Sequence, residues 1–273
     1  MRPQRERKDL NILECIPEEI FYMILKILEL SDLCSISQTC QKLYHMTRNP
    51  LLWTDITIDW KSIKKRRSLV HGLLSRASKI VNLQVENRNY EKVDTQRIID
   101  AVKQASNSLK SLKFSFDLYT GVKLKSNAVM QLGTLTQLTC LEFDGGCLTS
   151  KLVKEIAKLE KLERLKIPYA SNLIPQDLIH LFSKLKYLRS VKISSCGTAV
   201  NDEVVISLVK NNPHLESINI DNSQLFTGEA IKDIFENCPN IHHLTFSSCL
   251  QITNSSLLNM FYLPSSKLSY IFV

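Results

Sequence analysis

The stretch Leu188-Arg-Ser-Val191-Lys-Ile193 has apolar residues at its first, fourth and sixth positions, and the same pattern returns at Leu215-Glu-Ser-Ile218-Asn-Ile220. Working outward in both directions, we find nine copies of this pattern, whose first positions are 24 to 29 residues apart. These first positions are Trp53, Ile80, Leu109, Leu138, Leu162, Leu188, Leu215, Ile241 and Leu268. One copy arises easily by chance, but nine copies in near-constant step indicate a structural repeat.

Each copy predicts a short strand, because its last two apolar positions are separated by one residue that is usually polar. Covering helices are predicted at 94–105, 149–158, 176–182, 201–210 and 229–237, and Asp94, Thr149 and Asn201 are suitable N-caps. A single strand–helix unit cannot bury its apolar faces alone, so the units must stack. The predicted fold class is therefore α/β: a curved solenoid with a parallel sheet on its concave face.

Several of the later units contain cysteine or asparagine beside the strand, as in Ile193-Ser-Ser-Cys196, Asn237-Cys238-Pro239-Asn240 and Phe246-Ser-Ser-Cys249. With these residues and the repeat, the chain resembles the leucine-rich-repeat family, and its later units resemble the cysteine-containing subclass. Three earlier units lack a cysteine or asparagine at the corresponding position, so they are less regular.

Residues before Trp53 do not follow the repeat and predict three short helices. Pro17, followed by two acidic residues, predicts the start of the first helix, and Ser31-Asp32-Leu33 predicts the start of the second helix. The third helix is predicted from Gln41 to Arg48, where Asn49-Pro50 ends it. The apolar stripe of the first helix is too wide for one packing face; it consists of Ile20, Phe21, Ile24, Leu25, Ile27 and Leu28.

The order of these segments resembles the F-box family, through Ile16-Pro-Glu-Glu-Ile20, Asp32-Leu33, Thr39-Cys-Gln-Lys-Leu-Tyr44 and Asn49-Pro-Leu-Leu-Trp53. The expected domains are an F-box at 12–52 and leucine-rich repeats at 53–273, with about eight to nine strand units, the last incomplete. The resemblance implies a non-catalytic substrate receptor of a Skp–cullin–F-box ubiquitin ligase. Its F-box would bind a Skp-type adaptor, and through it a cullin–RING ligase, while the repeats would bind a target protein.

The resemblance also implies two groups of site residues. The expected adaptor-binding residues are Ile16, Pro17, Ile20, Leu25, Leu28, Leu33 and Trp53; packing within the helices is the alternative for each of them. The expected substrate-binding residues face outward from the concave sheet: Lys113, Glu142, Arg164, Lys166, Lys192, Asn219 and His243. This surface is basic on balance and fits an acidic or phosphorylated segment, and a mixed solvated surface is the alternative.

Other functions find less support in the sequence. No catalytic motif is present, and no cofactor is expected. No metal is expected either, because the adjacent His242 and His243 would point to opposite faces of a strand and are poor joint ligands. A leucine-rich-repeat scaffold or inhibitor acting outside a ligase is the alternative function.

The eight cysteines form no CxxC pair and are expected to be free thiols in a reducing compartment. No apolar run is long enough to span a membrane, and the polar N-terminus does not resemble a signal peptide. The expected localisation is cytoplasmic, nuclear or both. The net charge of +8 includes the run Lys64-Lys-Arg-Arg67, which is a solvated helix face, a nuclear import signal or a nucleic-acid patch. Nucleic acid is not the expected partner, because no aromatic residues are interleaved with the charges.

Overall fold

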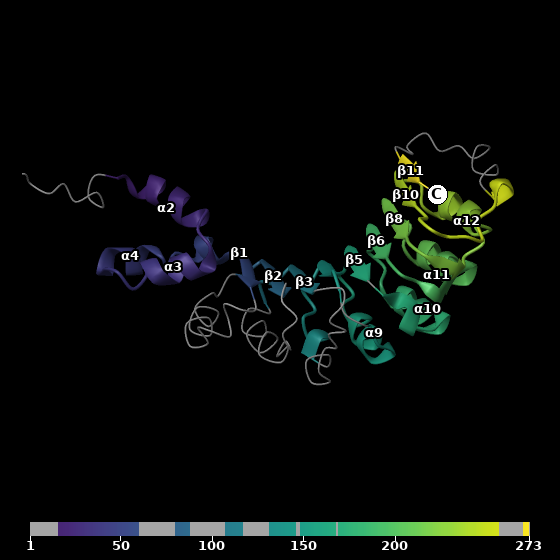
Figure 1. Ribbon diagram of the computed structural model, residues 1–273, viewed down its shortest axis with the longest axis horizontal. Coiled ribbons are helices and arrows are strands. Elements are labelled where there is room, and N and C mark those ends of the chain that lie inside the picture. Colours follow the sequence, from purple (N-terminus) through teal and green to yellow (C-terminus); the bar gives the residue numbers. More distant parts are fainter. Residues whose placement is uncertain are drawn as a thin grey trace, which may run out of the picture.

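The computed structural model describes residues 16–59, 80–87, 107–116, 131–145, 148–167, 169–256 and 270–272. It consists of a helical N-terminal region followed by a curved array of strands, with helices on the outer side of the curve (Figure 1). The buried apolar residues form one continuous core that runs from Leu25 in the helical region to Cys249 near the far end. The helical region is therefore packed onto the repeats through a shared core.

The N-terminal region contains α2 (Glu18–Lys26), α3 (Leu30–Ile36), α4 (Gln41–Met46) and the short 3-10 helix η1 (Pro50–Trp53). Pro17 precedes α2 as its N-cap, and Glu18 and Glu19 lie in its first turn. Asn49 caps η1, since its side-chain oxygen accepts a hydrogen bond from the Leu51 amide.

The predicted start of the second helix at Ser31 is wrong. The helix α3 begins one residue earlier, at Leu30, because Glu29 is extended and its carbonyl accepts hydrogen bonds from the amides of Asp32 and Leu33. The Ser31 hydroxyl bonds the neighbouring Asp32 carboxylate and caps no amide.

The repeats build one nine-stranded sheet, and all of its neighbouring strands are parallel. The strands are β1 (Asp55–Asp59), β2 (Asn82–Asn87), β3 (Ser111–Phe116), β4 (Cys140–Phe143), β5 (Arg164–Ile167), β6 (Ser190–Ile193), β8 (Ser217–Ile220), β10 (His243–Thr245) and β11 (Tyr270–Phe272). In register, Leu112 of β3 pairs with Leu83 of β2 and Leu141 of β4. Equivalent apolar positions thus stack on one another, which is the α/β solenoid that the repeat predicts.

The covering helices are α9 (Ser150–Ile156), α10 (Pro175–Lys184), α11 (Asp202–Asn211) and α12 (Ile231–Asn237). The N-caps predicted for two of them are confirmed: the side-chain oxygens of Thr149 and Asn201 accept hydrogen bonds from the amides of Leu152 and Val204. The helix predicted at 94–105, with its cap Asp94, lies outside the described residues.

A second sheet was not predicted. It pairs β7 (Gly197–Asn201) with β9 (Ser223–Leu225) in parallel, and η2 (Ala170–Asn172) occupies the corresponding place one repeat earlier. After β5, β6, β8 and β10 the chain turns at a residue with positive φ, and these residues are Tyr169, Ser195, Asn222 and Ser248. The next residue in each unit is small and buried, and these residues are Ala170, Cys196, Ser223 and Cys249. The strands β7 and β9 could not be predicted from alternating apolar residues, because turns of the backbone bring these segments together.

Candidate functional site

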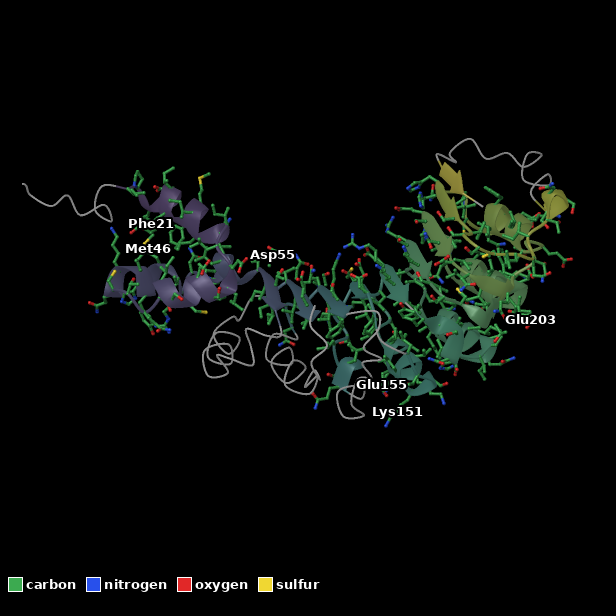
Figure 2. The ribbon with its side chains drawn as sticks, viewed as in Figure 1. Phe21, Met46, Asp55, Lys151, Glu155 and Glu203 are labelled. Carbon is green, nitrogen blue, oxygen red and sulfur yellow. The ribbon has the colours of Figure 1, made fainter. Side chains whose placement is uncertain are left out.

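The helix α2 and the two residues after it present two apolar faces. Phe21 and Leu28 pack against the core, and Leu25 is buried at 1% exposure. Phe21 and Met46 lie between α2 and the helices below it (Figure 2). The opposite face remains exposed in the chain, with Ile20 at 47%, Met23 at 65%, Ile24 at 41% and Ile27 at 82% exposure.

We call these four residues the α2 apolar face. Their spacing of three, one and three residues places them side by side along the helix. Four large apolar side chains in one exposed stripe are unusual for a solvated helix. Helices that dock into an apolar groove of a partner present such a stripe.

Only Ile20 of the seven expected adaptor-binding residues lies on this face, and three of the others are buried. Leu25, Leu33 and Trp53 are 1%, 5% and 6% exposed, so they pack the helical region together, and a contact of these residues with an adaptor stays a prediction. Trp53 also donates a hydrogen bond from its indole nitrogen to the Thr47 carbonyl, at 2.8 Å, which ties η1 to the end of α4. A buried aromatic with a satisfied polar atom is a core residue.

The remaining expected adaptor-binding residues lie nearer the surface. Pro17 and Ile20 are exposed, while Ile16 and Leu28 are half-buried. The expected adaptor-binding residues did not include Met23, Ile24 and Ile27. The signal for them was present, because Phe21, Leu25 and Leu28 form one stripe at helical spacing and leave these residues to a second one.

The second candidate surface is the concave face of the sheet. Pairing between strands aligns one outward residue from each into a single row: Thr57, Gln84, Lys113, Glu142, Lys166, Lys192, Asn219 and Thr245. Arg164 and His243 lie in the neighbouring row, with Ser111 and Cys140. All seven expected substrate-binding residues therefore lie on one face, and whether a target binds them stays a prediction.

The basic side chains of this face fall into two groups. Lys113 forms an ion pair with Glu142 at 3.0 Å, and Lys166 pairs with Asp144. Arg164 and Lys192 are exposed and form no ion pair with any residue of the described ranges. Part of the positive charge is thus neutralised within the sheet, and the guanidinium of Arg164 and the ammonium of Lys192 remain open to an anion.

A hollow of about 340 Å³ lies on the concave face, near the end of the sheet that is next to the helical region. We call it the concave hollow; its walls are Asp55, Ile56, Thr57, Asn82, Leu83, Gln84, Ser111, Lys113 and Arg164. Asp55 lies where the helical region meets the sheet (Figure 2). At this end the Asp55 carboxylate already accepts hydrogen bonds from Asn82 and Thr54.

Six cysteines lie in the described residues, and all six are free thiols, whereas Cys15 and Cys147 lie outside those ranges. Burial raises the pKa of Cys196 and of Cys238 to about 12, and Cys40 is exposed. Within the described ranges, no three His, Cys, Asp or Glu side chains gather in a way that could hold a metal ion. No helix of the described part is long and apolar enough to cross a membrane.

These thiols are expected to differ in reactivity. With iodoacetamide at mildly alkaline pH, Cys40 should be alkylated in the native protein, whereas Cys196 and Cys238 should react only after unfolding, because the thiolate is the nucleophile. Mass spectrometry of peptides from timed samples measures each site. Alkylation of Cys196 as fast as that of Cys40 would contradict the burial of the Cys196 side chain.

A match to a known protein family falls on the helical N-terminal region. Residues 13–59 match the F-box-like family, which identifies the segment from α2 to β1 as an F-box-like domain. The stacked strand–helix units that follow have the leucine-rich-repeat architecture. The protein is thus an F-box-like domain joined to a leucine-rich-repeat solenoid.

Among solved structures, the chain is similar to the crystal structure of the TLR13–ssRNA13 complex, with 17% sequence identity and a TM-score of 0.44. The similarity covers 71% of this chain and 25% of that one, so the chain spans about a quarter of the length of that protein. At this level the likeness adds nothing to the fold, which the strand register of the chain itself establishes.

Proposed function

We propose that this protein is the substrate-recognition subunit of an SCF-type ubiquitin ligase. In this role residues 12–52 hold a Skp-type adaptor, and through it a cullin–RING ligase, while residues 53–273 hold a target protein. The observation that carries the proposal is the exposed α2 apolar face within the F-box-like domain.

The α2 apolar face has the chemistry of a docking helix. Burial of a largely exposed Ile or Met side chain contributes about 1.5–3 kcal/mol, so Met23 and Ile27, the two most exposed residues of the face, are its strongest candidate anchors. Lys26 lies between Ile24 and Ile27 in the sequence, but at helical spacing it falls beside the stripe of Ile20, Met23, Ile24 and Ile27, and the stripe itself contains no charged residue, which suits an apolar groove on the adaptor.

The mechanism is positional. F-box proteins are generally non-catalytic adaptors, and we infer the same for this chain. Holding a target beside the ubiquitin-loaded enzyme raises the effective concentration of the target lysines, so this chain contributes geometry and no bond-making step. A ligase receptor of this kind acts in the cytoplasm, the nucleus or both, where the buried free thiols stay reduced.

The test is a titration of purified Skp-type adaptor against the wild type and a variant with Met23→Lys and Ile27→Lys. The variant should lose at least about 100-fold in affinity, because two anchors are replaced by charges that a groove cannot solvate. Its thermal unfolding should match that of the wild type, because both positions face solvent.

Leu250→Lys is the matched control, since Leu250 is 87% exposed and lies in the repeats, far along the chain from α2. This control should bind the adaptor as the wild type does. If the double variant binds equally well, the docking role of the α2 apolar face is wrong. If the wild type itself binds no adaptor, a scaffold or inhibitor acting outside a ligase becomes the better function.

A further inference from the structure

Arg164 contributes to the concave hollow from an unexpected distance. The other walls come from β1, β2 and β3, whereas Arg164 belongs to β5, two strands beyond β3. The intervening residue in this row is Cys140 of β4, which is small and buried. Its place lets the long Arg164 side chain lie over β4 toward Ser111.

The titration of Cys140 supports this placement. Burial raises the pKa of the Cys140 thiol, and hydrogen bonds from the side chains of Ser111 and Arg164 act against that shift. The guanidinium of Arg164 is therefore close to Cys140 and Ser111, at the edge of the hollow where Lys113 also lies.

The two basic side chains of the hollow, Lys113 and Arg164, differ in whether they are ion-paired. Lys113 is paired with Glu142, whose other carboxylate oxygen accepts a hydrogen bond from the Cys140 thiol at 3.3 Å. Arg164 has no ion-pair partner in the described part of the chain. A guanidinium binds carboxylate and phosphoryl groups through two parallel hydrogen bonds, so an open Arg beside a paired Lys is suited to one added anion.

We propose that the concave hollow selects the target protein by one anionic side chain, a phosphoryl group or a carboxylate, bound between Arg164 and Lys113. The rest of the segment extends across β2 and β1 toward Asp55, where Gln84, Asn82 and Thr57 meet its backbone polar groups. This inference rests on the proposed function, because it names the chemistry of the target that the receptor would hold. It also places the target at the end of the sheet nearest the F-box-like domain.

A polynucleotide fits the same surface less well. Carboxylates of the same face, Asp55, Glu142 and Asp144, would repel a chain of phosphates. In the paired rows of β1 to β10, no described outward residue is Tyr, Trp or Phe, so stacking platforms for bases are absent from these strands. A single anion on a protein segment is the better match.

The test uses three pools of fluorescent peptides with the same degenerate flanks and phosphoserine, glutamate or serine at the central position. Each pool is passed over the immobilised full chain. The wild type should retain the phosphoserine pool, the glutamate pool or both at least about tenfold over the serine pool. Arg164→Ala should abolish the difference, and Lys151→Ala, which removes an equal charge from α9, should preserve it.

Retention of phosphoserine alone identifies a phosphorylated target, and retention of both anionic pools identifies a constitutively acidic one. Equal retention of the three pools, no retention of any, or unchanged selectivity in Arg164→Ala overturns the proposal. Binding of polyuridylate tighter than the phosphoserine pool, and dependent on Arg164, also overturns it in favour of nucleic acid.

Adaptor binding by the Arg164→Ala chain, measured separately, keeps this inference apart from the proposed function. Arg164→Ala should bind the adaptor as the wild type does, whereas a wild-type chain that binds the adaptor but selects no anionic pool overturns the inference alone. A chain that selects an anionic pool but binds no adaptor overturns the proposed function and leaves the anion site standing.

Discussion

Asn212→Leu is expected to lower the free energy of unfolding of the repeats by about 3 kcal/mol. The Asn212 side chain is fully buried between two repeats: its oxygen accepts a hydrogen bond from the Leu188 amide, and its nitrogen donates one to the Leu208 carbonyl, both at 3.0 Å. Leucine has a similar volume but leaves the Leu188 amide and the Leu208 carbonyl without these partners. Urea or thermal unfolding followed by circular dichroism measures the loss.

The neighbouring Asn211 is the matched control. Its side chain also forms two hydrogen bonds, to Ser207 and Lys186, but it lies nearer solvent, where water replaces a lost partner. Asn211→Leu should therefore change stability by less than about 1 kcal/mol. Equal losses for the two variants would show that the buried bonds of Asn212 do not join the repeats as described.

Trp53→Ala is expected to destabilise the helical region by about 4 kcal/mol, because it removes a buried indole ring that joins η1 to the end of α4. The more informative change is Trp53→Phe, which keeps most of the apolar volume and removes only the hydrogen bond to the Thr47 carbonyl. Its cost should be about 1–2 kcal/mol.

Adaptor titration separates a packing role of Trp53 from a contact role. If Trp53 packs, Trp53→Phe binds the adaptor with wild-type affinity at temperatures where it is folded. A loss of tenfold or more in affinity, with unfolding unchanged, would show that Trp53 contacts the adaptor although only 6% of the residue is exposed in the chain alone. The Met23→Lys and Ile27→Lys variant is the opposite reference, since it should lose affinity and keep stability.

Much of the fold follows from the sequence alone. The repeat predicted every strand of the nine-stranded sheet, because apolar positions such as Leu112 and Leu141 can be buried together only if equivalent strands lie in register. It also predicted which residues face outward, since side chains alternate along a strand. The assignment of the later units to the cysteine-containing subclass, the domain boundaries and the localisation stay predictions.

Helical spacing divides the apolar residues around α2 into two stripes, but only tertiary structure decided which stripe is exposed. Ile24 and Leu25 are adjacent and chemically alike, and only the position of α3, α4 and η1 makes one a surface residue and the other a core residue. Likewise, the charges of Lys113 and Arg164 look equivalent in the sequence. The register places Glu142 beside Lys113 and the small Cys140 beside Arg164, so the first cation is paired and the second reaches the concave hollow. Periodicity specifies burial within one unit, whereas pairing depends on contacts between units that the chain brings together only when it folds.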